Sequence, residues 1–104
     1  MIYVIATIEL CDGKRNEFFE EFNKIVTAVR AEPGCIEYGP AEDVRTDIPI
    51  QETIGDNVVT IMERWTDTDA LKAHLNIAHM QSYREAVAVI VKKTGVRILQ
   101  PMRK

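Results

Sequence analysis

The stretch that decides the fold runs from Glu63 to His79 and reads ERWTDTDALKAHLNIAH. It overlaps residues 58–65, an apolar segment rich in β-branched and aromatic side chains that is typical of a strand. Residues 66–69 then supply threonine and aspartate, whose side-chain oxygens accept hydrogen bonds from the free amides of a first helical turn. We therefore predict a strand that ends at Trp65, followed by a short helix over residues 67–75.

The segment before this stretch predicts a strand, a helix and a second strand. Residues 2–10 are rich in β-branched side chains and indicate the first strand. Residues 14–31 carry apolar side chains at helical spacing and indicate an amphipathic helix that ends at Glu32-Pro33-Gly34. Residues 35–44 read as a weaker strand, because they include a proline. The expected buried stripe of the helix is Phe18, Phe22, Ile25 and Val29, widened by Phe19 and Val26.

The remaining segments complete the order of elements. Residues 45–57 read as a long loop that leads into the strand ending at Trp65. After the short helix, the spacing of Met80, Tyr83, Val87 and Ile90 predicts a longer helix that stops near Gly95, with a last strand over residues 96–101. The order β-α-β-β-α-β is that of a ferredoxin-like α+β fold with a four-stranded antiparallel sheet. We predict a single domain over residues 1–104.

Layer packing adds an expectation about assembly. Helices on one face of such a sheet leave the other face bare, and both faces of the strands at 2–10 and 58–65 are substantially apolar. Soluble monomers rarely expose an apolar surface of that size. We therefore expect a homodimer in which two sheets cover each other.

Composition limits the classes of function. The net charge of −3, with no basic stripe, argues against a nucleic-acid partner. No run approaches the roughly 20 apolar residues of a membrane span, and residues 2–10 lack the basic start of a signal peptide. Cys11 and Cys35 show no metal or redox spacing and read as reduced, partly buried side chains. We expect a cytoplasmic protein.

Three side chains form the candidate catalytic group. Glu63 and Trp65 are two apart on a strand and point to the same face, over which the helix bearing His74 can fold. His74 is either a general base or a hydrogen-bonded structural histidine. Glu63 either orients a histidine or pairs with an arginine. Trp65 is either a wall for a planar ligand or a core aromatic, and both readings can hold together.

Four further side chains are candidates for substrate binding. His79 opens the longer helix, where the positive end of the helix dipole disfavours an imidazolium. It is either a base or acceptor, or a solvent-exposed residue. Tyr38 and Tyr83 are core or rim aromatics whose hydroxyls can bond a substrate oxygen, and Met80 packs beside them. No metal constellation stands out, because the two histidines are not joined by a Cys or Asp cluster.

These residues also carry a family resemblance. The segment AEPGCIEY at 31–38, followed by ERWTD at 63–67 and by Ala70, Leu71, His74 and His79, resembles the antibiotic biosynthesis monooxygenase family. The resemblance implies a dimeric α+β barrel and oxidation of a small phenolic or quinol substrate by O2, with no metal or flavin. Haem degradation, known among relatives, is disfavoured because the first strand offers Thr7 and no asparagine.

Two other functions stay open at this point. The same scaffold also suits an isomerase or another metabolite-processing enzyme, which needs an acid and a base but no O2. It also suits a non-catalytic dimeric module that binds a small molecule, because function lies in sites and not in the fold.

Overall fold

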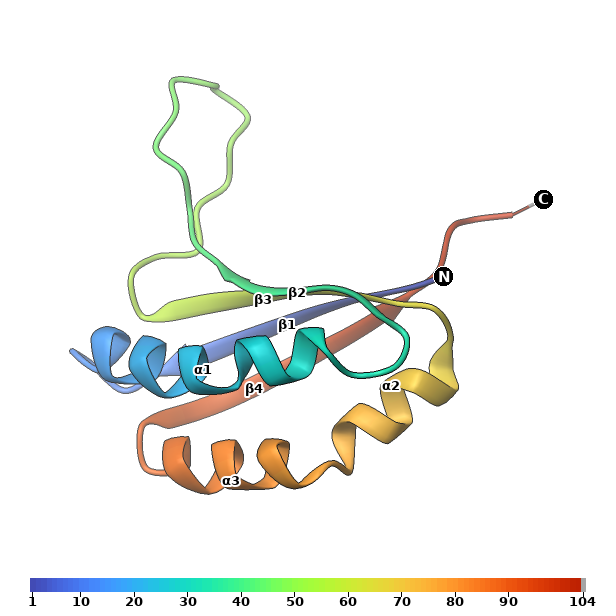
Figure 1. The fold of residues 1–104 in the computed structure, drawn as a ribbon. Helices are drawn as coiled ribbons and strands as arrows, with labels where there is room; N and C mark the ends of the chain where they lie inside the picture. Colours follow the sequence, from blue (N-terminus) through green and yellow to red (C-terminus); the bar gives the residue numbers. More distant parts are fainter. Residues whose placement is uncertain (104) are drawn as a thin grey trace.

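The computed structural model describes residues 1–103 and is built on one open antiparallel sheet (Figure 1). Its strands are β1 (Ile2–Leu10), β2 (Cys35–Ala41), β3 (Val58–Trp65) and β4 (Val91–Leu99), in the spatial order β2-β3-β1-β4. The helices α1 (Arg15–Arg30), α2 (Thr68–Leu75) and α3 (Ala78–Val87) all lie on the same face (Figure 1). The predicted ferredoxin-like α+β fold is confirmed.

The two faces of the sheet differ as the sequence alternation predicts. On β1, Val4 and Ile8 are buried under the helices, whereas Tyr3 and Ile5 on the other face stay partly exposed. The predicted stripe of α1 is buried as well, but Phe19 is 51% exposed and does not belong to it. The core therefore lies in a single layer between the sheet and the three helices.

The turn after α1 brings the ends of several elements together. Gly34 has a φ of +83°, and a Cβ at this position would lie 2.5 Å from the Cβ of Ala70. The backbone amide of Thr66 donates to the carbonyl of Gly34 at 2.9 Å, and Asp67 caps α2 by accepting from the amide of Ala70 at 2.8 Å. The predicted start of the short helix is thus confirmed. The close approach of the turn to α2 places Glu32 beside both following helices.

The C-terminal third differs from the prediction. Helix α3 ends at Val87, not near Gly95, and β4 begins at Val91, not at residue 96. The reason is tertiary: β4 pairs along nearly the whole of β1, with Lys93 opposite Glu9 and Gly95 opposite Thr7. Backbone pairing with the central strand overrides the local helix-end signals of lysine and glycine. Strand β2 likewise ends earlier than expected, at Ala41.

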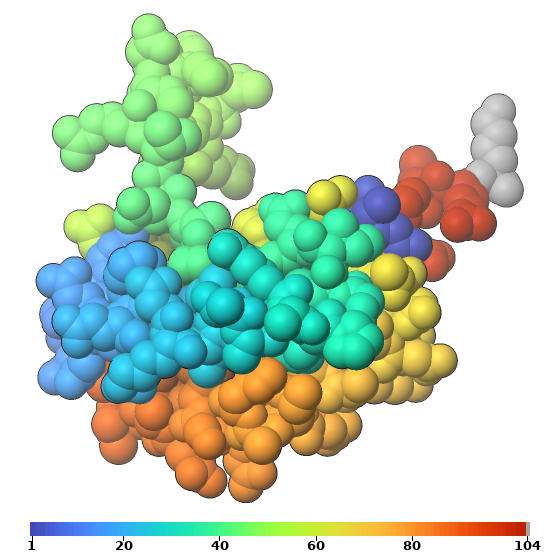
Figure 2. Space-filling view, in the orientation of Figure 1, coloured from blue at the N-terminus to red at the C-terminus, as the bar shows by residue number. Residues whose placement is uncertain are grey.

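Residues 42–57 form a long arm that projects from the open side of the sheet, away from the helices (Figures 1 and 2). The arm is tied by its own contacts: Asp43 Oδ2 accepts from the amides of Ile54 and Gly55 at 2.8 and 3.2 Å. Gln51 Nε2 also donates to the carbonyl of Val44 at 2.7 Å. The predicted long loop is confirmed. None of the helices within residues 1–103 is both long and apolar enough to cross a bilayer.

Candidate active site

A buried carboxylate, that of Glu32, holds both histidines of the chain. Nδ1 of His74 lies 3.1 Å from each of its oxygens, and Nε2 of His79 lies 2.7 Å from Oε2. The side chains of Glu32 and His74 are 5% and 1% exposed, whereas that of His79 is 26% exposed. The cluster therefore reaches from the interior to the surface.

Each member of the cluster comes from a different element. Glu32 lies in the turn after α1, His74 on the inner side of α2 one turn after the buried Leu71, and His79 in the first turn of α3. The connection between α2 and α3 is only two residues long, so both rings stay close enough to reach one carboxylate.

The contacts decide the tautomer of His74. A carboxylate only accepts hydrogen bonds, so Nδ1 of His74 carries the proton and Nε2 is left with its lone pair. No fully buried polar side-chain atom among the described residues lacks a partner, and Nε2 has none in the protein. Nε2 is therefore not fully buried, and its lone pair is free to accept a hydrogen bond. Burial lowers the pKa of His74 against the opposing effect of Glu32, which leaves a neutral ring able to accept a proton.

Glu63 and Trp65 form a second buried pair beside this cluster. The indole Nε1 donates to Oε1 of Glu63 at 2.9 Å. Burial raises the pKa of Glu63 to about 7, because it lacks a cationic partner and the charge of Glu32 acts in the same direction. The residue that orients His74 is thus Glu32, and Glu63 instead binds the indole.

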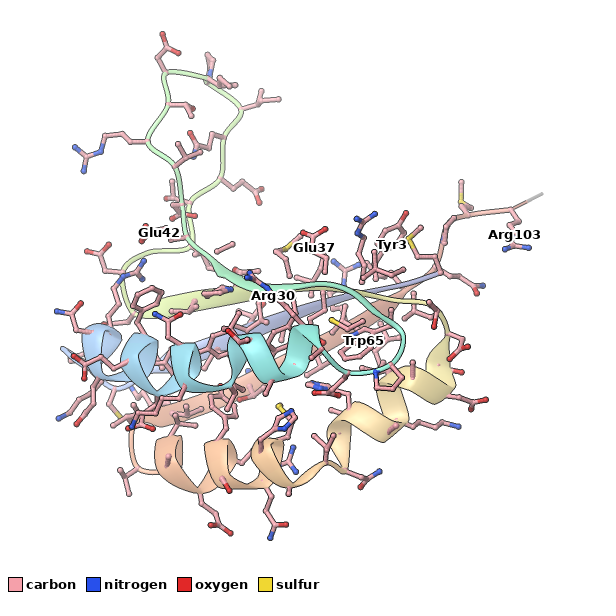
Figure 3. The ribbon with its side chains drawn as sticks, in the orientation of Figure 1. Tyr3, Arg30, Glu37, Glu42, Trp65 and Arg103 are labelled. Carbon is pink, nitrogen blue, oxygen red and sulfur yellow. The ribbon has the colours of Figure 1, made fainter. Side chains whose placement is uncertain are left out.

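Trp65 is fully buried and lies between the sheet and the helices (Figure 3). Its ring lies against that of His74, with centroids 4.7 Å apart and planes inclined by 36°. Trp65 therefore packs against the His74 ring without lining the cavity itself.

A mostly apolar cavity of about 410 Å³ opens between the sheet and the helices α2 and α3. Glu63 and His74 both line it, as do Tyr38, Tyr83 and Met80, whereas Trp65 and His79 do not. Arg84 is the one residue in this lining with a permanent charge. Apart from Thr94 on β4, the rest of the wall is aliphatic or aromatic. Its members include Val4, Ala6, Ile8, Phe22, Ile61, Leu71, Val87, Val91, Val96 and Ile98.

The two tyrosines give the cavity neutral polar groups. Burial raises the pKa of both Tyr38 and Tyr83, so that both hydroxyls stay protonated at neutral pH. The Tyr38 ring meets His74 edge-on at a centroid distance of 5.4 Å. The structure thus brings a neutral imidazole, two phenol hydroxyls and a carboxyl group to one apolar hollow.

Residues 1–86 match the family described as antibiotic biosynthesis monooxygenase. The chain belongs to this family. It is 39% identical over 103 residues to the probable quinol monooxygenase YgiN of Escherichia coli K12, covering 97% of this chain and 98% of that protein. It is 32% identical over 83 residues to YcnE of Bacillus subtilis, covering 80% and 78% of the two chains.

Solved structures share the fold at lower sequence identity. One from Nitrosomonas europaea superposes with a TM-score of 0.81 at 18% identity, covering 99% of this chain and all of the other. One from Deinococcus radiodurans gives a TM-score of 0.79 at 18% identity, covering 100% and 95%. The sheet and helices that enclose the cavity are thus the fold shared with these structures.

Glu32 is the member of this histidine cluster that the sequence reasoning missed. It had been read only as part of the Glu-Pro-Gly stop after α1. A physical signal was present: a carboxylate just past a helix C-terminus meets the negative end of the helix dipole. An acidic residue in that unfavourable place calls for cationic or N–H partners. Within residues 1–103, no cluster of three or more His, Cys, Asp or Glu side chains has metal-binding geometry.

Proposed function

We propose that the protein oxidises a small phenolic or quinol substrate with O2 and that the substrate supplies all the electrons. The observation that carries this proposal is the neutral His74 ring, held by Glu32, on the wall of an apolar cavity. A relative that matches nearly the whole chain bears the name probable quinol monooxygenase, which supports the same substrate class.

His74 acts as the general base in this reaction. Its Nε2 takes the proton of a substrate hydroxyl, and the resulting anion is electron-rich enough to pass an electron to O2. One oxygen atom of O2 then enters the ring at a C–H position and the other leaves as water. A phenol plus O2 thus gives a quinone plus water, with no external reductant.

The cavity wall suits an anionic intermediate of this kind. The hydroxyls of Tyr38 and Tyr83 can donate to the substrate oxygen, and the aliphatic side chains exclude water from reactive oxygen species. A volume of about 410 Å³ falls within the usual range of small-molecule sites.

The test is O2 uptake with a panel of quinols and naphthols, comparing wild type with His74→Gln. We expect a loss of about 100-fold or more in rate, because a positioned base contributes on that order. Lys72→Gln is the matched control, since Lys72 is exposed on the same helix and does not line the cavity. Uptake no faster with enzyme than in buffer, across the whole panel, would rule the proposal out.

One observation favours a second candidate, an isomerase of a small oxygenated metabolite. Glu63, with a pKa of about 7, and His74 line the same cavity, so an acid and a base face one ligand. Such an enzyme needs no O2. Turnover that continues unchanged under nitrogen would select this reaction over the oxidation.

We also propose that two copies of the chain pair through the bare faces of their sheets. Tyr3, Ile5, Met62 and Leu99 line a shallow apolar hollow on that face, and Figure 3 shows Tyr3 on the side away from the helices. Charges of opposite sign lie at its two edges: Glu37 on β2, which also pairs with Arg64 of the same chain, and Arg97 on β4. A two-fold axis parallel to the strands would bring these unlike edges together.

Light scattering of the purified chain tests the pairing. We expect the mass of a dimer for wild type and of a monomer for Met62→Lys, because Met62 is 41% exposed at the centre of the bare face. Phe19→Lys changes an apolar residue that is 51% exposed on α1, on the helix side of the sheet, and should stay dimeric. A monomeric wild type would contradict the proposal.

A further inference from the structure

Glu32 connects two histidines that lie in very different surroundings. His74 is almost fully enclosed and lines the cavity, whereas His79 does not line the cavity and has a partly exposed ring. The contacts of 3.1 Å and 2.7 Å make a continuous series from the cavity through the carboxylate to the surface. The proposed reaction uses only the inner half of this series, which leaves His79 without a role.

We propose that Glu32 joins His74 and His79 into one proton-sharing unit, in which a proton taken from the cavity by His74 is balanced by a proton released to water by His79. This inference rests on the proposed function only for the source of the proton. The coupling between the two rings is a property of the chain itself.

The charges of the cluster carry the argument. One buried carboxylate can balance one imidazolium, and a second imidazolium nearby would leave a net positive charge in a poorly solvated place. Because both rings contact the same carboxyl group, each lies within a few ångströms of the other's charge. Protonation of one ring therefore opposes protonation of the other.

The protons balance over one cycle. The substrate O–H bond breaks and an N–H bond forms at Nε2 of His74, which becomes an imidazolium. In the proposed resting state His79 is the imidazolium, because its contact with Glu32 at 2.7 Å offsets the unfavourable helix dipole. It gives its Nδ1 proton to water and keeps Nε2–H on Glu32. The cluster then holds one carboxylate and one imidazolium before and after the step: the substrate proton stays on His74, a proton of His79 goes to water, and the charge of the cluster does not change.

Other charged and titratable groups surround the cluster and set its background. They come from β2, β3 and α3, and none of them contacts both rings. They are Cys35, Tyr38, Glu63 and Arg84. Of these, Arg84 disfavours an imidazolium at His74, and the neighbouring cation His79 acts in the same direction.

Ring-nitrogen NMR gives the direct test, because the chain has two histidines in all and each can be followed separately. In wild type we expect neutral His74 to carry its proton on Nδ1. In His79→Gln, which keeps an N–H donor for Glu32 but cannot become a cation, we expect the titration midpoint of His74 to rise by about half a unit or more. In Glu32→Gln we expect it to fall by about one unit.

A matched control separates the cluster from general charge effects. Glu85→Gln removes an exposed carboxylate from the same helix as His79, and screening should hold the shift of His74 to about 0.2 units or less. An unchanged midpoint in His79→Gln would overturn the inference. So would a neutral His74 with its proton on Nε2, a result that needs no variant and survives any failure of a variant to fold.

Activity then distinguishes this inference from the proposed function. If both hold, the acid limb of the pH–rate profile moves to higher pH in His79→Gln by the same shift that NMR records for His74. A shifted midpoint of His74 without O2 uptake in any variant would contradict the proposed oxidation but support the proton-sharing unit. O2 uptake with an unshifted midpoint would remove the proton-sharing unit alone.

Discussion

Two buried carboxyl groups, those of Glu32 and Glu63, lie on either side of the rings of His74 and Trp65, and they differ in what binds them. Glu32 receives contacts from two imidazoles, rings that can carry a positive charge. Glu63 receives one N–H from a neutral indole. Both residues are 8% exposed, so burial alone does not distinguish them.

Their different partners show how one site can hold two acidic residues with separate tasks. A carboxylate that accepts from two imidazole N–H groups orients both rings. A carboxyl group with only a neutral donor titrates near neutrality, which is where the pKa of Glu63 lies. It can therefore donate or accept a proton in the cavity, whereas Glu32 determines which nitrogen of His74 carries the proton.

The largest expected effect comes from removing the partnered carboxylate. Glu32→Ala leaves the buried ring of His74 and the partly exposed ring of His79 without their acceptor. We therefore expect the free energy of unfolding to fall by about 3 to 5 kcal/mol. Urea denaturation measures it. The control is Glu37→Ala, which breaks an exposed pair with Arg64 at 2.9 Å and should cost less than about 1 kcal/mol. Equal losses in the two variants would show that the buried cluster contributes no more than a surface pair.

The second effect is the contribution of Glu63 to the dependence of stability on pH. Its pKa is about 7 in the folded chain against 4.5 without the fold, so the folded state binds more protons between these values. The contribution is therefore complete below pH 4.5 and is lost as the pH rises through 7. At about 1.4 kcal/mol per unit, the loss amounts to about 3 kcal/mol.

Glu63→Gln isolates this contribution, because the amide oxygen can still accept from the indole and cannot ionise. His74, whose pKa is lowered, acts with the opposite sign, since its contribution is lost as the pH falls. We therefore expect the variant to gain stability over wild type as the pH rises from 5 to 8, in urea titrations at each pH. A difference that stays constant over this range would contradict the raised pKa.

Much of the comparison could be anticipated from the residues. Alternation on β1 and β3 placed Glu63 and Trp65 on the covered face, and the cap at Asp67 placed His74 over them. Period and capping are local properties, so the sequence shows them directly.

The partner of each carboxyl group could not be predicted in this way. Glu32 is 42 residues from His74 and 47 from His79, and their contact depends on the close approach of Gly34 to Ala70. The start of β4 was predicted wrongly for the same reason. Pairing with β1 determines where β4 begins, whereas the local sequence signals indicated a helix that continues to Gly95. Long-range packing fixes both features, and a single sequence carries little trace of it.

The smallest expected effect concerns the indole that is the partner of Glu63. Trp65→Phe keeps an aromatic ring against His74 but removes the N–H that Oε1 of Glu63 accepts at 2.9 Å. A buried acceptor left without a donor costs about 2 kcal/mol, and the cost should be greatest when Glu63 is ionised. We expect urea denaturation to show most of the loss near pH 8 and less of it at pH 5.

Loss of this donor should also raise the pKa of Glu63 further, since the hydrogen bond from Trp65 lowers it. Combining Trp65→Phe with Glu63→Gln tests whether the two substitutions act through the same hydrogen bond. If they do, their effects on the free energy of unfolding will not add, because contacting groups interact. If the indole acts through Glu63, Trp65→Phe should lose its dependence on pH once Glu63→Gln is present. A pH dependence that survives in the double variant would place its origin elsewhere, at His74, and would make the indole a support of the imidazole and not of the carboxyl group.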